Sequence, residues 1–456
     1  MRSQRGLSLI ELMVALAIGA LLLLGLFQVF SASNMSAQMG AALSRVQENG
    51  RFALDFMRTE IRMAGHMGCT SGSALVRDID LAPTQMQSAM QIGNQQVSFR
   101  VPTPAGRVAP PFIYDFRYDV QGYEANGTAS NTATPNDFTL QLPPVTGIAS
   151  NWTPELPDDL LNLNPRPIAG SDIVVIRYGL PGEMQLIGGF TTGNPLNPVV
   201  AITNGRIPDS GQTFVGVNQT GVPFVAAACA GNTQALAFIG TSIVETADRM
   251  TVTGNNTLNW PEIAAEGLSS SQEGSATLVR MEFVAYYVGL NANNIPALYR
   301  VSFGPAVRQA LAPLVTEELV EGVDSLQISY GVEIGPIIPP VAGAPPRPQV
   351  AAQLSSRADV YATAAQLHEV NGPVAPLLGR HPIEVWRRVM SVRIGLLARS
   401  TSRISGVGTD AQGPYVVNGV RIALSNQDAL MRQGYEEVIT VRNRLRNLNT
   451  LNLNTP

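Results

Sequence analysis

The sequence LSLIELMVALAIGALLLLGLFQVF occupies residues 7–30 and decides how the chain begins. Almost every residue in it is apolar, and Glu11 is its one charged residue. A helix needs about 20 apolar residues to cross the hydrocarbon core of a bilayer, so this stretch is long enough to span a membrane. Arg2 and Arg5 precede it without any acid, which predicts a cytoplasmic N-terminus and a remainder on the outer side.

Three interpretations of this stretch compete. A cleaved secretory signal would end near Ser31-Ala32-Ser33, but the apolar run exceeds the usual length of about 7–15 residues. A plain membrane anchor explains the length but not Glu11, because a carboxylate at mid-bilayer costs about 2.5–3.5 kcal/mol. The third interpretation also uses the order of residues: a basic leader ends in Gly6, a large apolar residue follows at Leu7, and a lone acid stands at Glu11.

Residues 5–12 (RGLSLIEL) resemble the leader of type IV pilins and pseudopilins. The resemblance implies that a prepilin peptidase cuts between Gly6 and Leu7 on the cytoplasmic side and N-methylates Leu7. Glu11 then lies about 6 Å along the helix from the new α-amine. Among bundled helices, the amine of an incoming subunit can face a neighbour's Glu11, and pairing these charges fixes the stagger between subunits. The alternative is a Glu11 that only reaches the inner headgroups.

The helical pattern continues beyond the apolar stretch. No proline occurs before Pro83, and residues 34–66 are compatible with a helix throughout. Leu54, Met57 and Ile61 recur at helical spacing, which predicts that this later part is amphipathic. The whole helix is expected to run from about 8 to about 64, roughly 85 Å, with Gly19 and Gly25 as its weak points. The charged residues between the apolar positions predict a solvated face rather than a site; they are Arg51, Asp55, Arg58, Glu60 and Arg62.

After residue 69 the helical pattern gives way to short β-type runs. The predicted strands are 172–178, 281–290, 297–303, 324–332, 389–399 and 436–443. Residues 324–332 alternate apolar and polar, which predicts a half-buried antiparallel strand, and 291–296 predicts a hairpin connection. Residues 101–170, 205–275 and 335–348 have the composition of loops. A long helix followed by an antiparallel sheet predicts an α+β fold, with the helix packed on a sheet-rich head.

These patterns divide the chain into four parts. Residues 1–6 form the leader, 7–30 the transmembrane assembly helix, and 31–66 its amphipathic extension. Residues 67–456 form an extracytoplasmic β-rich head. Within that head, residues 70–280 are expected to be a large, loop-rich insertion.

Several blocks resemble one branch of the pilin family, the PilW-type minor pilins. These blocks are residues 49–69, 285–288, 297–300, 319–331, 386–389, 392–400 and 435–443. The resemblance implies a minor pilin that waits in the inner membrane with its head in the periplasm, joins other minor pilins and the major pilin, and primes filament assembly. It would end at or near the pilus tip, with a tip adhesin as a further partner. The implied filament functions are adhesion, twitching motility and DNA uptake.

Two other functions stay open at this point. A minor pseudopilin of type II secretion, similar to the J-type, would share the leader but is typically much shorter than this chain. A membrane-anchored surface adhesin or enzyme would use the helix only as an anchor, and the loop-rich head would leave it room to bind a ligand.

The composition argues against catalysis and nucleic-acid binding. The net charge of −4 does not suit direct binding to nucleic acid. The chain has no lysine, which removes Schiff-base and P-loop lysines, and it has no zinc-protease, P-loop, EF-hand or nucleophile-elbow motif. We therefore expect neither an enzyme nor a cofactor. Two acidic pairs are typical of solvated turns, with calcium binding as the alternative: Asp78 with Asp80, and Asp158 with Asp159.

The chain has 2 cysteines, Cys69 and Cys229. Both would lie outside the cytoplasm, where oxidising conditions favour a disulfide. A bridge would close a loop of about 160 residues and contribute about 4–5 kcal/mol if it acts through chain entropy. It would tie the end of the helix to the head. Two buried thiols are the alternative.

Overall fold

The computed structural model describes residues 8–68, 70–71, 89–92, 95–98, 112–116, 118–128, 136–180, 184–185, 199–203, 222–228, 235–245, 249–255, 276–303, 314–334, 357–367, 382–403, 413–426 and 428–442. The predicted cleavage site at Gly6 and Leu7, both cysteines, Asp78 and Asp80, and the predicted loop at 335–348 lie outside these residues.

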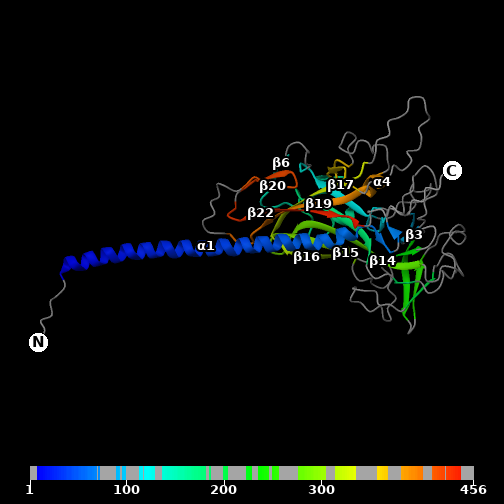
Figure 1. Ribbon diagram of the computed structural model, residues 1–456, viewed down its shortest axis with the longest axis horizontal. Coiled ribbons are helices and arrows are strands. Elements are labelled where there is room, and N and C mark those ends of the chain that lie inside the picture. Colours follow the sequence, from blue (N-terminus) through cyan, green and yellow to red (C-terminus); the bar gives the residue numbers. More distant parts are fainter. Residues whose placement is uncertain are drawn as a thin grey trace, which may run out of the picture.

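One unbroken helix, α1 (Leu9–Met63), forms the N-terminal part of the fold. Its bounds lie within a residue of the predicted ones, and it runs straight through Gly19 and Gly25, around which space is open. The helix ends where Ala64 turns away and Gly65 takes a φ of +72°, a left-handed conformation that glycine adopts without strain. Figure 1 shows the first half of α1 standing free of the head and the second half lying along it.

The largest sheet has strands from both halves of the head. These are β5 (Val120–Ala125), β7 (Trp152–Thr153), β8 (Ile173–Gly179), β9 (Met184–Gln185), β10 (Val199–Thr203), β11 (Val222–Ala228), β12 (Ala235–Glu245), β13 (Arg249–Asn255), β14 (Ala276–Leu290), β15 (Pro296–Phe303) and β16 (Leu314–Glu321). Its main order is β10-β13-β12-β11-β14-β8-β5-β7, and β14 also pairs with β9 and with β15, which in turn pairs with β16. The long strand β14 therefore organises this sheet.

Two smaller sheets complete the main body of the head. One has the order β18-β17-β19-β22, from β17 (Val323–Val332), β18 (Val360–Ala362), β19 (Val389–Arg399) and β22 (Arg432–Thr440). The other has the order β20-β21-β6, from β6 (Asn136–Leu140), β20 (Tyr415–Val417) and β21 (Val420–Leu424). Among the described strands β21 and β6 pair in parallel, and the other pairs are antiparallel, which confirms the α+β class.

Short elements fill the connections. They are the hairpins β1 (His66–Met67) with β2 (Thr70–Ser71) and β3 (Ala89–Ile92) with β4 (Gln95–Ser98), the helices α2 (Asp158–Leu161) and α4 (Pro382–Arg387), and the 3₁₀ turns η2 (Phe112–Tyr114) and η3 (Ala149–Asn151).

The six predicted strands are confirmed as β8, β14, β15, β17, β19 and β22. The predicted hairpin connection is also confirmed. The Asn291 side chain accepts hydrogen bonds from the backbone N–H groups of Asn293 and Ile295, both at 3.0 Å, and so closes the turn between β14 and β15.

The prediction that 324–332 is half-buried was wrong, because every residue of β17 is buried. Its polar side chains lie under other backbone segments rather than in solvent. Ser325 Oγ and Gln327 Nε2 donate to the Gly170 carbonyl at 3.1 and 3.2 Å, and Ser329 donates to Asn418 at 3.0 Å. The alternating pattern therefore marks two buried faces, of which one is hydrogen-bonded.

The loop predictions for 101–170 and 205–275 were partly wrong. The first stretch contains β5, β6 and β7, and the second contains β11, β12 and β13. In the first stretch Trp152 is 1% exposed and Tyr114 is fully buried, so part of the predicted insertion belongs to the core.

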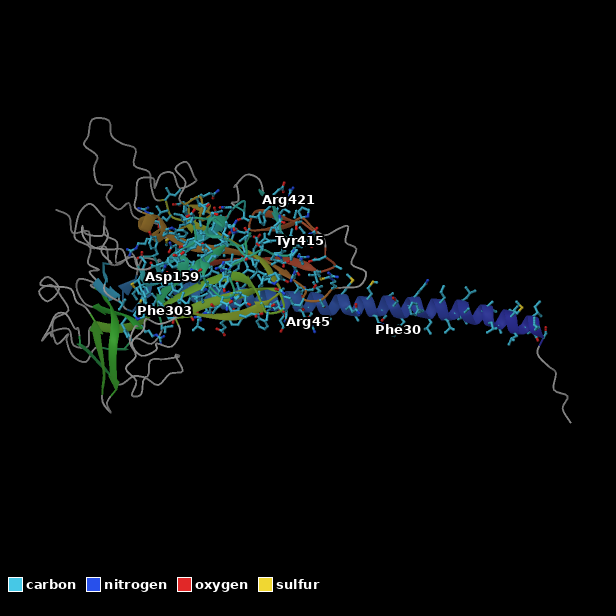
Figure 2. All side chains as sticks on the ribbon, turned by 180° about the vertical axis from the view of Figure 1, so that it is seen from behind. Phe30, Arg45, Asp159, Phe303, Tyr415 and Arg421 are labelled. Carbon is cyan, nitrogen blue, oxygen red and sulfur yellow. The ribbon has the colours of Figure 1, made fainter. Side chains whose placement is uncertain are left out.

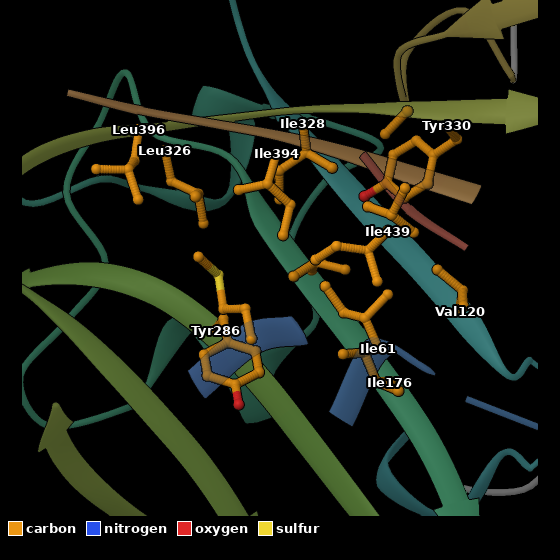
Figure 3. Close-up of a cluster of buried hydrophobic side chains, with 14 of the residues drawn as sticks. Ile61, Val120, Ile176, Tyr286, Leu326, Ile328, Tyr330, Ile394, Leu396 and Ile439 are labelled. Atoms are coloured by element: carbon orange, nitrogen blue, oxygen red, sulfur yellow. The ribbon is translucent and has the colours of Figure 1, made fainter. Parts of the chain in front are cut away.

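Two large apolar cores flank the strands, and a smaller cluster around Leu140, Val417 and Ile422 lies at the β20-β21-β6 sheet. The first joins α1 to both main sheets and includes Ile61 of α1, Ile176 of β8, Tyr286 of β14, and Leu326 and Ile328 of β17 (Figure 3). The second, around Trp152, lies among β5, β8, β14 and β15. The helix is thus built into the same core that holds the two sheets together.

Candidate assembly helix

The N-terminus of α1 is closed by a capping box that contains Glu11. Ser8 is the N-cap residue, with an extended backbone, and its hydroxyl accepts a hydrogen bond from the Ile10 N–H at 3.3 Å. The Glu11 carboxylate accepts one from the Ser8 N–H at 3.0 Å. This reciprocal arrangement satisfies N–H groups that the helix leaves without a backbone acceptor. Glu11 therefore lies in the first turn, where the helix dipole favours a negative charge.

The first half of α1 exposes an apolar surface on all sides. Its large apolar residues from Leu9 to Phe30 are between 52% and 78% exposed. Figure 2 shows Phe30 on the free part of the rod and Arg45 where the helix reaches the head. Among the described residues, α1 is the one helix with the length and hydropathy needed to cross a membrane. A free surface of this kind requires lipid or other apolar helices around it.

The second half of α1 packs one face into the head. Val46, Ala53, Met57 and Ile61 are fully buried there. Burying a side chain of the size of valine, methionine or isoleucine contributes about 1.5–3 kcal/mol, so the packed face attaches the helix firmly. At Gly50 the helix backbone lies against the Tyr435 ring of β22, and a Cβ on Gly50 would approach that ring to 2.5 Å.

A half-buried polar cluster around Glu60 adds a second, polar attachment of the helix to the head. The Glu60 carboxylate accepts hydrogen bonds from Arg300 Nε and Nη2 of β15 at 3.0 and 2.7 Å, from the Tyr178 hydroxyl of β8 at 3.1 Å, and from the Tyr286 hydroxyl of β14. Burial, reinforced by the charge of Glu60, raises the pKa of both tyrosines. Burial alone would lower the pKa of Arg300, but the bonds to Glu60 outweigh it and raise that pKa.

The prediction of a solvated charged face on the helix was therefore only partly correct. Asp55 is exposed, but Glu60 is not, and Arg58 reaches the sheet. Arg58 Nε and Nη2 donate to the two Glu437 oxygens of β22 at 2.6 and 2.9 Å, a bidentate pair, and Nη1 donates to Asp55 at 3.0 Å. No local pattern in the sequence links Glu60 to Arg300, which lies 240 positions away.

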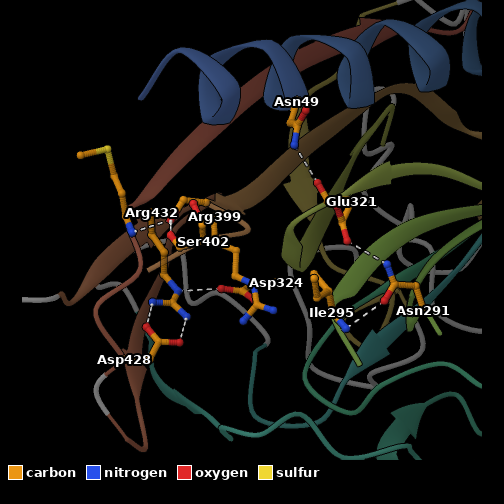
Figure 4. Close-up of polar contacts among 11 residues, drawn as sticks. Asn49, Asn291, Ile295, Glu321, Asp324, Arg399, Ser402, Asp428 and Arg432 are labelled. Carbon is orange, nitrogen blue, oxygen red and sulfur yellow. Dashed lines mark hydrogen bonds and ion pairs between the residues drawn. The ribbon is translucent and has the colours of Figure 1, made fainter. Parts of the chain in front are cut away.

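A second polar cluster stands where the helix meets the head (Figure 4). Asp324 is fully buried, and its two oxygens lie 2.6 Å from Arg432 Nε and 3.3 Å from Arg399 Nε. Arg432 Nη2 also donates to Asp428 at 2.7 Å. Next to this cluster, Asn49 of α1 donates to the Glu321 carbonyl at 2.8 Å. This carbonyl ends β16, so the bond fixes the helix to that strand.

A groove of about 450 Å³ lies between α1 and β16. Phe52 and Phe56 line it from the helix and are 52% and 47% exposed. Arg45 and Arg399 stand in the same groove. The helix therefore offers partly apolar surface to neighbours even along the head.

The structure places one of the predicted site residues, Glu11, and leaves the cleavage site and the cysteines untested. Asp158 and Asp159 occupy the first turn of α2, where a helix dipole stabilises acidic side chains. In the described part of the chain, no three histidine, cysteine, aspartate or glutamate side chains gather as metal ligands.

Comparison with known families gives two matches. The family model for the prokaryotic N-terminal methylation motif matches residues 1–27, and the model for Type IV Pilus-assembly protein W matches residues 285–443. No curated protein and no solved structure is significantly similar to the chain. The first match covers the leader and the capped start of α1, and the second covers β15 to β22 with the end of β14. Both families are structural components of pilus assembly, and the two matches support a type IV pilus-assembly protein similar to the PilW type over these residues.

Proposed function

We propose that the chain is a minor pilin that is cut between Gly6 and Leu7, methylated on Leu7, and inserted through α1 into a complex that primes pilus assembly and ends at the tip. It would wait in the inner membrane with its N-terminus in the cytoplasm and its head in the periplasm. Its partners would be the prepilin peptidase, other minor pilins and the major pilin. Adhesion, twitching motility and DNA uptake would be functions of the filament that it helps to start.

The observation that carries this proposal is the division of one continuous helix into a bare half and an anchored half. The bare half is apolar around its whole circumference, which suits lipid before assembly and other helices after it. The anchored half is held by buried apolar side chains and by Glu60, Arg58 and Asn49. A rod held this firmly would carry the head to a defined place in a filament.

The capping box leaves the Glu11 carboxylate able to bind the α-amine of a neighbouring subunit. Its carboxylate already accepts one hydrogen bond from Ser8, and it keeps further acceptor sites. The α-amine of an incoming Leu7 would add a charge-assisted bond in a low-dielectric bundle, where such a bond is strong. Pairing of this kind would align the two helices along their axes.

The test replaces Glu11 with glutamine and measures incorporation of the chain into sheared pili by immunoblot. Glu48→Gln is the matched control, since Glu48 is an exposed acid on the same helix. We expect E11Q to accumulate in the membrane and to be depleted from pili, while E48Q is incorporated like the wild type. Equal incorporation of E11Q and wild type would refute the proposed role of Glu11.

A further inference from the structure

The two main sheets of the head meet at a buried pair of carboxyl groups, Glu124 and Asp172. Glu124 is the second-last residue of β5, and Asp172 directly precedes β8. Both residues are 2% exposed. They lie far from the bare half of α1, and the proposed function does not use them.

Asp172 bonds to both sheets at once. Its Oδ1 accepts from the Ala125 N–H of β5 at 2.8 Å, and its Oδ2 accepts from the Ile328 N–H of β17 at 2.7 Å. Its own N–H donates to the Leu326 carbonyl at 2.8 Å. Because β5 and β17 belong to different sheets, this one side chain bridges them.

Glu124 lies next to this bridge. The Thr128 hydroxyl is 3.2 Å from Glu124 Oε1 and 3.4 Å from Asp172 Oδ1, and it donates to the Ala125 carbonyl at 2.6 Å. The Thr363 side chain and the Ala364 N–H also bond to the Glu124 carboxyl group.

The surroundings offer the pair little compensating positive charge. Tyr330 of β17 is fully buried against β5, and its hydroxyl would lie 1.9 Å from a Cβ on Gly122. The charge of Arg177 in β8 acts on Tyr123 of β5, where it opposes the rise in the pKa of that tyrosine. Arg387 lies at the end of α4, which packs on β5. Tyrosines are neutral at ordinary pH, so they supply no positive charge that would offset a second carboxylate here.

Burial decides how the pair titrates. Burial raises the pKa of Asp172 to about 7, against the opposing hydrogen bonds from Ala125 and Ile328. Burial, and then the charge of Asp172, raise the pKa of Glu124 well above its usual value. Near neutral pH the folded head therefore holds protons that the unfolded chain releases near pH 4.

We propose that Glu124 and Asp172 form a proton-sensitive joint, which holds the two sheets together in mild acid and loosens them as the pH rises. Both folded-state pKa values are raised, so the folded state binds more protons than the unfolded state and stability falls with increasing pH. The helix α1 contacts β19 and β22 in one sheet and β8 and β16 in the other. Loosening of the joint therefore changes the surface of the head on which α1 packs.

The test is amide hydrogen exchange of the full-length chain in detergent micelles, followed by mass spectrometry of the peptides that contain β5 and β17. Protection is compared at pH 5 and pH 8 after correction for the intrinsic exchange rate. In the pH range where opening of the joint releases one proton, the protection factors of both wild-type peptides are expected to fall about tenfold per pH unit. Glu124→Gln, which resembles the protonated side chain, removes one of the two titrating groups and is expected to lose clearly less protection at pH 8 than the wild type.

Glu282→Gln is the matched control. Glu282 is also a buried glutamate whose pKa burial raises to about 7, but it lies in β14 beside Arg280, away from the joint. It should leave the loss in the β5 and β17 peptides unchanged. Equal wild-type protection at pH 5 and pH 8 would overturn the proposal, and this result needs no variant. An E124Q chain that unfolds at pH 5, or that loses protection at pH 8 like the wild type, would overturn it as well.

Discussion

Replacing Glu60 with glutamine should weaken the attachment of α1 to the head. The Glu60 carboxylate receives two bonds from Arg300 and one each from Tyr178 and Tyr286, and 15% of its side chain is exposed. Glutamine keeps one acceptor oxygen but removes the charge that neutralises Arg300. Removing one partner of a fully buried ion pair costs about 3–5 kcal/mol. Because the Arg300 side chain is 22% exposed, some water reaches it, and we expect a loss of about 2–4 kcal/mol in the free energy of unfolding.

The assay is urea-induced unfolding of the full-length chain in detergent micelles, followed by the fluorescence of the buried residues Trp152 and Trp386. Asp55→Asn is the control, since Asp55 stands five positions earlier on the same helix with 71% of its side chain exposed. It should leave the urea midpoint unchanged. A double variant with Arg300→Met should lose less than the two single losses added together, because the pair acts as a unit. A midpoint for E60Q equal to that of the wild type would refute this reasoning.

Three further predictions concern the head. Gly122→Ala places a methyl group where the buried Tyr330 hydroxyl lies and should destabilise the head by about 1–3 kcal/mol; an unchanged urea midpoint would contradict the close packing. Burial raises the pKa of Glu282 to about 7, so its share of stability is lost as the pH rises through 7; Glu282→Gln should reduce the loss of hydrogen-exchange protection in the β14 peptide between pH 5 and 8, and an unchanged loss in that peptide would contradict this. A bridge between Cys69 and Cys229 predicts that the double serine variant is digested faster by protease under oxidising conditions, and equal digestion would count against the bridge.

The sequence predicts the helix and the main strands because both depend on local patterns. An apolar run of about 20 residues without proline favours a helix that can span a bilayer, and the shorter run VMSVRIGLLAR at 389–399 forms β19 within the predicted bounds. Glu11 could be singled out for the same reason, since one acid in an apolar stretch is visible in the sequence alone.

The parts that were missed depend on partners distant in the chain. The strand β5 has the sequence VQGYEA, whose Gly122 and Glu124 argue against a strand until β8 pairs with it and Tyr330 packs on the glycine. Glu60 was assigned to a solvated face because Arg300 and the two tyrosines cannot be located from helical spacing. The polar face of β17 was assigned to solvent because the Gly170 carbonyl that covers it lies in a different sequence block.

The identity of the first residue of the mature chain tests the central claim most directly. The chain would be purified from cell envelopes, and its N-terminal peptide would be sequenced by mass spectrometry. Processing as a pilin predicts that this peptide begins at Leu7 with a methyl group on its α-amine. A peptide that begins at Met1 or at Asn34 would contradict it, since the first indicates an unprocessed anchor and the second an ordinary exported protein.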